Sequence, residues 1–200
     1  NYTPNNGGGI YMNNGLVQDC RVFTNRIYYS QGGGIYMGNG RVTHSMISSN
    51  STYGAGSSYG GGIEIYNGFI SNCVVERNYA QANGGGIMCQ AGTAATVTTT
   101  RIAYNTAYLY TGGGAYIYNP GAYFRGCQFI GNYAPAWGYS GGGAWLGNGI
   151  VDACAFSNNT AYYNGGGVYV DTYGILLNSL VGSNNVWYQG GGAYVNYGAV

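Results

Sequence analysis

The sequence predicts an all-β fold, a single parallel β-helix of about 7–8 rungs with about 26 residues in each. Three observations predict it. A Gly-Gly-Gly triplet recurs eight times in 200 residues, and a short apolar segment of period two follows each triplet. A second apolar block has an anchor residue that stands five residues before a regularly placed Asn. A unit this short cannot close its own core, so successive units must stack and pair strand on strand.

The glycine triplets mark the start of each unit. They begin at Gly7, Gly32, Gly60, Gly84, Gly112, Gly141, Gly165 and Gly190, which are 24 to 29 residues apart. A phosphate loop or a hinge is needed once, whereas a sharp turn between closely stacked rungs is needed in every unit. Glycine permits backbone conformations and close contacts that a Cβ would block. The triplets are therefore predicted to be structural.

The segment after each triplet is predicted to be a strand with one buried face. In "GGGIYM", Ile35 and Met37 point to one face and Tyr36 points to the other. The outward position is aromatic in most units. It is occupied by Tyr11, Tyr36, Glu64, Met88, Tyr116, Trp145, Tyr169 and Tyr194.

The second block of each unit carries two further columns. A small anchor residue stands at Cys20, Ser45, Cys73, Thr100, Cys127, Cys154 and Ser179. An Asn follows it by five residues, at Asn25, Asn50, Asn78, Asn105, Asn132, Asn159 and Asn184, and Asn1 fits the same column. Asn tolerates left-handed backbone at a turn, and stacked amides can hydrogen-bond from rung to rung. We expect a structural Asn ladder, and two or three short strands in each unit.

Composition limits the classes of function. There are 40 Gly and 24 Tyr but only 11 charged residues, for a net charge of +1. Six scattered arginines give no electrostatic footprint for nucleic acid, and no apolar run is long enough for a transmembrane segment. A nearly neutral surface offers little repulsion between copies. Because the chain begins and ends inside a repeat, we expect residues 1–200 to be one continuous array, a segment of a longer or end-to-end self-associated assembly.

The sequence gives little support for catalysis. Its acids are Asp19, Glu64, Glu76, Asp152 and Asp171. Glycoside hydrolysis needs two carboxylates about 5–10 Å apart, whereas five rungs separate Asp19 from Asp152, which is about 24 Å. Glu64 and Glu76 share a rung but lie on different strands. We expect no catalytic residue, no metal and no cofactor.

The remaining candidate residues also have structural readings. His44, the single histidine, is predicted to be a solvated outward side chain. The five cysteines form no Cys-x-x-Cys pair, and four of them share the anchor column with Ser and Thr, so we expect free thiols. Arg125 and Asp152 are predicted to pair across neighbouring strands.

The repeats resemble those of a known family. The motifs "GGGI" and "GGGA", together with "FTN" after Val22, "FIGN" at Phe129 and "FSNN" at Phe156, are similar to the GGA-I and F-x-x-N motifs of polymorphic outer membrane proteins. The resemblance covers nearly the whole chain. It implies a right-handed parallel β-helix outside a bacterial cell or on its surface, used as a passenger, an adhesin or a surface scaffold.

Two functions follow from these observations. The first is a non-catalytic extracellular structural protein, a β-solenoid filament or stalk segment. The alternative is an adhesin of the autotransporter type that binds glycans or a host surface through an exposed tyrosine face, since aromatic rings suit sugar faces. The candidate binding or assembly stripe comprises Tyr11, Tyr36, Tyr116, Trp145, Tyr169 and Tyr194. Further tyrosines, among them Tyr162, Tyr163 and Tyr188, lie in the loops after the Asn column.

Overall fold

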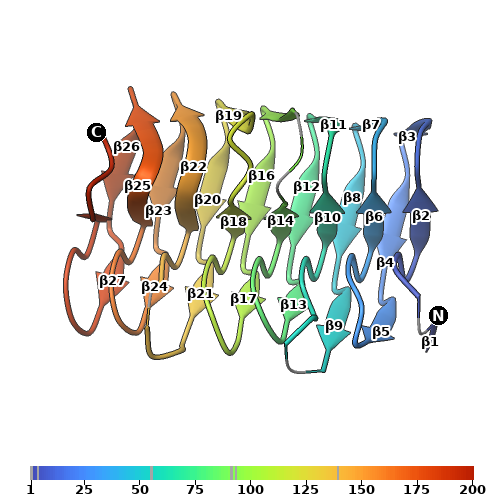
Figure 1. Cartoon of the computed structure of the whole chain (residues 1–200), viewed down its shortest axis with the longest axis horizontal. Coiled ribbons are helices and arrows are strands. Elements are labelled where there is room, and N and C mark those ends of the chain that lie inside the picture. Colours follow the sequence, from blue (N-terminus) through green and yellow to red (C-terminus); the bar gives the residue numbers. More distant parts are fainter. Residues whose placement is uncertain (1, 4, 55, 91, 93, 139) are drawn as a thin grey trace.

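The computed structural model describes residues 2–3, 5–54, 56–90, 92, 94–138 and 140–200, and Asn1 lies outside them. The described chain is all β, with about seven turns of about 27 residues and no helix. The turns lie side by side along one axis (Figure 1). The predicted parallel β-solenoid is confirmed. Most turns contain four short strands where the sequence predicted two or three, and the turns of β22 and β25 contain three because one long strand covers two columns.

The strands fall into four columns, one member of each per turn. The first, directly after the triplets, holds β2 (Ile10–Met12), β6 (Ile35–Met37), β10 (Ile63–Ile65), β14 (Ile87–Cys89), β18 (Ala115–Ile117), the first parts of β22 (Ala144–Asp152) and β25 (Val168–Leu177), and β28 (Ala193–Val195). The second holds β3 (Leu16–Gln18), β7 (Arg41–Thr43), β11 (Gly68–Ser71), β15 (Ala95–Thr98), β19 (Tyr123–Arg125) and the second parts of β22 and β25.

The third column lies around the anchor residues and the fourth follows the Asn column. The third holds β4 (Arg21–Phe23), β8 (Met46–Ser48), β12 (Val74–Glu76), β16 (Arg101–Ala103), β20 (Gln128–Ile130), β23 (Ala155–Ser157) and β26 (Leu180–Gly182). The fourth holds β1 (Tyr2–Thr3), β5 (Arg26–Tyr28), β9 (Ser51–Tyr53), β13 (Tyr79–Ala80), β17 (Thr106–Ala107), β21 (Tyr133–Ala134), β24 (Thr160–Ala161) and β27 (Asn185–Val186).

Every strand pairs in parallel with its counterpart in the next turn. Ile63, for example, pairs with Ile35 on one side and Ile87 on the other. The third and fourth columns form sheets of seven and eight strands. The first and second columns join into one 13-stranded sheet because β22 and β25 run through the corner between them. A constant register explains why the apolar columns align in sequence, since a one-residue slip would reverse every side chain.

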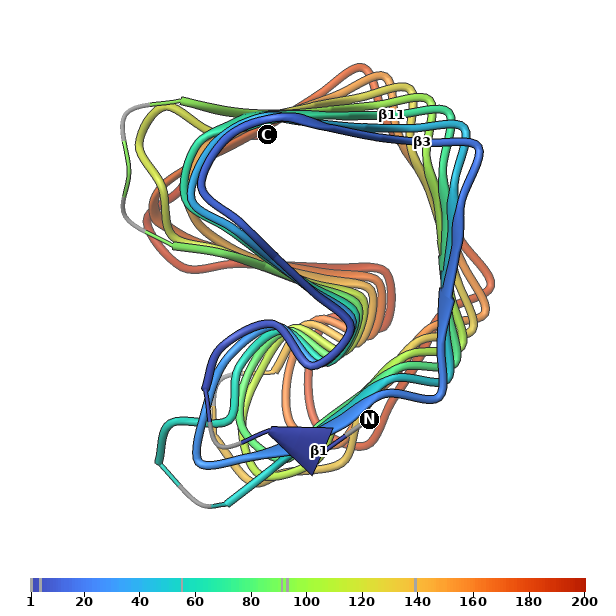
Figure 2. The ribbon, with the colours of Figure 1, turned by 90° about the vertical axis from the view of Figure 1, so that its right-hand side faces the viewer.

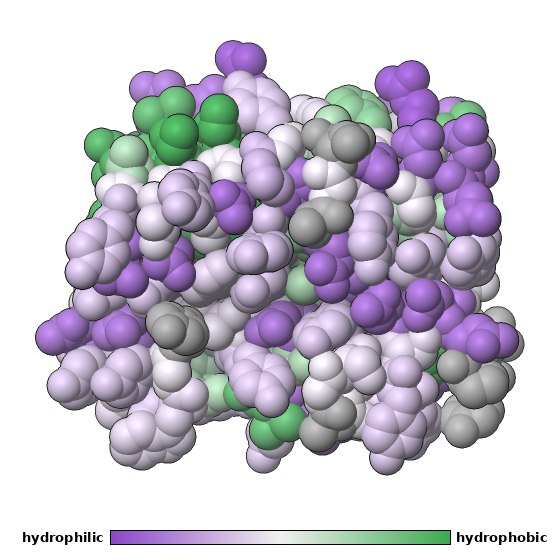
Figure 3. Space-filling view, viewed as in Figure 1, coloured by the Kyte–Doolittle hydropathy of each residue, from purple (hydrophilic) through white to green (hydrophobic). Residues whose placement is uncertain are grey.

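The first three columns enclose the apolar core (Figure 2). Their inward residues are fully buried in the inner turns and partly buried in the terminal turns, and Phe129 and Phe156 stack with ring centroids 4.5 Å apart. The fourth column lies against the glycine triplets, and the loop after it curls back toward the outer side of the first column. The face drawn in Figure 3 is mostly weakly to strongly hydrophilic, with an apolar patch near β25 and β26. Leu177 of β25 and Leu180 of β26 are exposed.

The three glycines of a triplet have different reasons to be glycine. The first has φ between 59° and 75° in all eight triplets, a left-handed conformation. A Cβ on the second, Gly85, would press on the Gly113 carbonyl of the next turn and on the Thr106 backbone of the fourth column. A Cβ on the third, Gly86, would meet the Gly114 carbonyl and the Asn105 amide. The triplet thus sets both the turn and the spacing.

Gly85→Ala is expected to lower the free energy of unfolding by about 1–3 kcal/mol, because the added methyl can be accommodated only by moving backbone. Gly182→Ala is the matched control, since a Cβ there has open space and an ordinary backbone conformation. Chemical denaturation of both variants measures the difference. Equal stability of the two would show that the turns are not packed as closely as described.

The Asn column forms a continuous ladder of buried side-chain hydrogen bonds. In six successive steps from Asn25 to Asn184, each Asn Nδ2 donates to the Oδ1 of the next Asn at 2.9–3.1 Å. The same oxygen accepts the backbone N–H of the preceding Asn, as in Asn78 to Asn105 at 2.9 Å. The second amide hydrogen is also used, since Asn105 Nδ2 donates to the Val75 carbonyl at 2.9 Å.

The left-handed residues stand one position earlier than predicted. The Asn residues themselves have ordinary φ, and the residue before each has φ between 54° and 62°. These residues are Thr24, Ser49, Arg77, Tyr104, Gly131, Asn158 and Ser183. The expectation of left-handed backbone at Asn was therefore wrong. Asn occurs in its column because its side chain is both donor and acceptor inside the rod.

The anchor column is a second ladder and explains the mixture of Cys, Ser and Thr. Ser45 Oγ donates to the Thr43 carbonyl at 2.8 Å and accepts the Cys20 N–H at 3.1 Å. Cys154 Sγ likewise accepts the Cys127 N–H at 3.3 Å. A small side chain with one donor and an acceptor satisfies the position. All five cysteines are free thiols, as predicted.

Candidate functional site: an aromatic groove

The predicted aromatic stripe follows the outer side of the first column but is not an exposed face. Tyr11 is 55 % exposed, whereas Trp145 and Tyr169 are only 7 % and 3 % exposed. Tyr36, Tyr116 and Tyr194 are half-buried. The expectation of a continuous exposed tyrosine face was therefore wrong, because the loops before the triplets fold over the middle of the stripe.

Neighbouring rings of the stripe stack from turn to turn. Tyr11 and Tyr36 are nearly parallel at 5.0 Å, and Tyr116 and Trp145 at 4.4 Å. Tyr169 and Tyr194 form a third pair at 5.1 Å. Glu64 and Met88 interrupt the aromatic series, and both are buried. Stacked rings stabilise the sheet whether or not the stripe binds anything.

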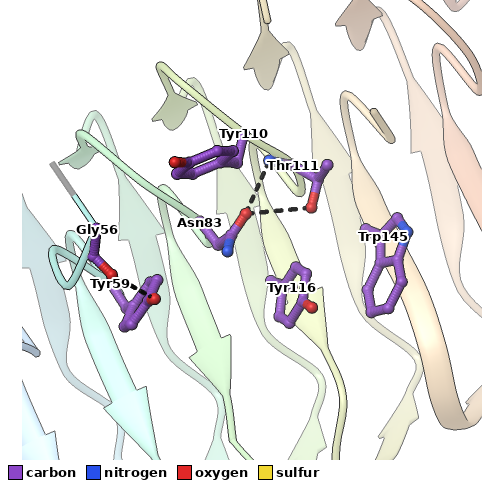
Figure 4. A pocket seen from close by; sticks show the side chains of 7 residues that line it. All are labelled: Gly56, Tyr59, Asn83, Tyr110, Thr111, Tyr116 and Trp145. Carbon is purple, nitrogen blue, oxygen red and sulfur yellow. Dashed lines mark hydrogen bonds between the residues drawn. The ribbon is translucent and has the colours of Figure 1, made fainter. Parts of the chain in front are cut away.

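The stripe and the loops enclose a groove, which we define by the residues of its main cavity (Figure 4). Tyr116 and Trp145 form one wall, and the loop residues Gly56, Tyr59, Asn83, Tyr110 and Thr111 form the rest. The cavity volume is about 320 Å³. This size, with aromatic walls and a few fixed polar groups, is typical of small-molecule sites.

Hydrogen bonds fix the polar wall of the groove. Asn83 Oδ1 accepts the Thr111 N–H at 2.9 Å and the Thr111 hydroxyl at 3.2 Å, and the Tyr59 hydroxyl donates to the Gly56 carbonyl at 2.6 Å (Figure 4). Burial raises the pKa of Tyr116 to about 12. The lining residues include no Asp, Glu, Lys, Arg or His.

Glu64 is the unusual residue of the stripe. It is fully buried between Tyr36 and Met88, and neither carboxyl oxygen has a hydrogen-bond partner among the residues that the structure describes. Burial raises its pKa well above the usual range, and the nearby Gln90 side chain opposes this only in part. Since an isolated buried charge is very costly, Glu64 is held as a neutral acid.

The other acids have structural partners. Glu76 pairs with Arg101 at 2.6 Å. Asp152 accepts hydrogen bonds from the Tyr123 hydroxyl and Asn178 Nδ2, both at 2.9 Å, and lies 3.7 Å from Arg125, as predicted from the sequence. Hydrogen bonds from Asn178 and Tyr123 lower the pKa of Asp152.

His44 is exposed at a left-handed turn. The described residues contain no group of three or more His, Cys, Asp or Glu side chains that could hold a metal, and no helix among them could span a membrane.

Sequence reasoning missed the loop wall of the groove. Tyr59, Asn83 and Thr111 lie in the stretch of variable length between the Asn column and the triplets, where alignment on glycine gives no register. The one usable signal was that each lies immediately before a triplet. Whether the stripe binds a ligand stays a prediction.

Parallel strands in register on successive turns, with two side-chain ladders inside, define the class as a parallel β-solenoid. The chain matches the family model described as a right-handed beta helix region over residues 2–199, and it belongs to this family. The predicted right-handed coil agrees with that match. No curated protein and no solved structure matches the chain.

Proposed function

We propose that the chain is a non-catalytic structural rod on the outside of a bacterial cell. The observation that carries this proposal is the unbroken Asn ladder, which ties each turn to the next through all six steps from Asn25 to Asn184. Buried, fully satisfied polar networks rigidify a core. A scaffold or stalk requires rigidity along its whole length, whereas a catalytic site requires it only locally.

The acids support a structural role. Glu64 is sealed inside the stripe, Glu76 is paired with Arg101, and Asp152 accepts from two side chains. A general acid or base must reach its substrate. The resemblance of the repeats to those of polymorphic outer membrane proteins supports a place at the cell surface.

The proposal is tested by two measurements on the purified chain. We expect trypsin to leave Arg77 and Arg101 intact over hours, because both lie in or beside β12 and β16 of the third column. We also expect no product from acidic or neutral polysaccharides. Turnover that disappears in Asp152→Asn, a substitution that keeps the side-chain shape, would overturn the non-catalytic assignment.

A second candidate function is glycan binding in the groove, favoured by its aromatic walls and by the amide of Asn83. In this proposal Tyr110 and Tyr116 contact the faces of a neutral sugar, and Asn83 Nδ2 donates to a hydroxyl. Asn83→Ala should then abolish retention on immobilised glycans, whereas Asn185→Ala, an exposed Asn of β27, should not. Equal retention of both variants would argue against the groove.

A further inference from the structure

A second aromatic cluster lies apart from the stripe, in the loops that follow the fourth column. Its members are Trp137, Tyr162, Tyr163, Trp187 and Tyr188, which we call the aromatic cage. They come from the loops after β21, β24 and β27, three strands that are neighbours in one sheet (Figure 1). The rings line a hollow of about 430 Å³, and every lining residue that the structure describes is aromatic.

The cage rings form two adjacent sets. Trp137 and Tyr162 have ring centroids 4.7 Å apart and are tilted by 44°, and Tyr162 and Trp187 are 5.6 Å apart. Tyr163 and Tyr188 stack at 4.7 Å. Trp137, Trp187 and Tyr188 are 77 %, 65 % and 62 % exposed. Such exposure of large aromatic side chains at one place is typical of an interaction site.

Backbone hydrogen bonds hold the cage in place. The Tyr162 N–H donates to the Ala134 carbonyl at 2.9 Å, and the Gln189 N–H donates to the Tyr163 carbonyl at 3.1 Å. The Tyr163 N–H donates to Ser140 Oγ at 3.1 Å. The loops after β24 and β27 are thus tied to the preceding turn, and little of their ordering entropy remains to be lost on binding.

The chemistry of the cage differs from that of the groove. The groove offers an amide and a threonine hydroxyl, which suit a ligand with many hydroxyls. The side chains of the cage offer aromatic faces, with tyrosine hydroxyls and indole N–H groups as their only polar atoms. A sugar stacked there would gain contact with its faces alone, because the cage directs no amide or carboxylate toward its hydroxyls. A quaternary ammonium group has no N–H and needs no hydrogen-bond acceptor.

The distribution of charge also favours a cation. Residues 126–200 contain neither Lys nor Arg, and of their two acids Asp152 pairs with Arg125 while Asp171 has no basic partner among the ion pairs of the described residues. All members of the cage lie in this part of the chain, which supplies no basic side chain to repel a cation. Aromatic faces attract cations within about 6 Å of the ring centroid.

We propose that the aromatic cage binds a quaternary ammonium group, the trimethylammonium head of choline or of a choline-bearing molecule. The methyl groups contact the rings, and the positive charge is stabilised by their faces. This site is independent of the proposed structural role and of the groove.

The test uses the whole chain and two ligands of the same shape. Choline and its uncharged carbon analogue, 3,3-dimethylbutan-1-ol, are titrated by ligand-observed NMR on their methyl signals. We expect choline to bind about tenfold more tightly than the analogue. Equal binding of the two would overturn the proposal, as would no saturable choline binding. Because the wild-type chain is compared with itself, the result does not depend on the folding of a variant.

Variants locate the site. Trp187→Leu should weaken choline binding at least about fivefold, whereas Tyr173→Leu, an equally exposed aromatic of β25 outside the cage, should leave it unchanged. Equal loss in both variants, or choline binding that survives in Trp187→Leu, would show that the cage is not the site. A saccharide such as cellobiose that binds at Trp187 in place of choline would also contradict the assignment.

The source of the group is found by cosedimentation with vesicles. Retention on phosphatidylcholine but not on phosphatidylglycerol vesicles would identify a lipid headgroup as the source. Choline binding without vesicle retention would identify a soluble or polymer-borne quaternary ammonium. Both outcomes support the proposed chemistry.

Discussion

Asn105→Ala is expected to lower the free energy of unfolding by about 3–6 kcal/mol. The side chain is fully buried and makes four hydrogen bonds, two donated by Nδ2 to Val75 O and Asn132 Oδ1 and two accepted by Oδ1 from Asn78. Alanine removes all four and leaves two or three buried polar groups unpaired, at about 1–3 kcal/mol each. Urea denaturation followed by circular dichroism measures the change.

Asn185→Ala provides the control for this prediction, because Asn185 is exposed and should lose less than about 0.5 kcal/mol. Asn105→Asp is the sharper test. It keeps the shape and the acceptor Oδ1, but its second oxygen replaces the NH2 group and cannot donate to Val75 or Asn132, so it should be about as damaging as alanine. A stable Asn105→Asp variant would contradict the donor role of the ladder.

Glu64→Met is expected to raise the free energy of unfolding by about 1–3 kcal/mol at pH 7, because it replaces an unpartnered buried acid by an apolar side chain that the same column accepts at Met88. Burial raises the pKa of Glu64 above its ordinary value of 4.5. Above pH 4.5 the Glu64 carboxyl loses its proton in the unfolded chain but keeps it in the folded chain, so folding takes up a proton. The free energy of unfolding of the wild-type chain should therefore fall as pH rises from 4.5 toward the folded-state pKa.

The Glu64→Met variant has no carboxyl at this position, so its free energy of unfolding should not change with pH over the same range. The titratable groups beside Glu64 do not contribute to this pH dependence, because burial raises their pKa values further above the ordinary values of 10.0 for tyrosine and 9.0 for cysteine. These groups are Tyr36, Tyr59, Tyr66 and Cys89. Glu76→Gln is the control. It breaks the ion pair with Arg101 and should lose a little stability, not gain it. A wild-type curve that rises from pH 5 to 8 would show that Glu64 is not held neutral.

The repeat made most of the fold predictable. The columns of Gly85 and Asn105 repeat in every unit because each turn contacts the same backbone positions of the next turn. The same physical constraint therefore selects the same residue type in each repeat. The anchor column was readable for the same reason. The fourth strand of each turn was not, because strands such as Tyr79–Ala80 are two residues long and too short to show a period.

The candidate sites were predictable only in part. Period two placed Tyr116 and Trp145 outside the core, but it could not show that a loop folds over them. Trp137 and Trp187 lie five and three residues after their Asn, so they share no column in the sequence although both contact Tyr162. Loops of variable length bring such residues together through backbone geometry that the sequence pattern does not record.

Hydrogen exchange measured by mass spectrometry tests most directly the central claim that all turns are locked into one rigid rod. Backbone amides of the inner turns, from β10 to β24, should exchange slowly and at one shared rate, because opening one turn breaks the Asn ladder on both sides. Faster, independent exchange of β14, β18 or β22 beside the groove would contradict the account. It would show that the turns around the groove open separately, so that the chain is not one rigid rod.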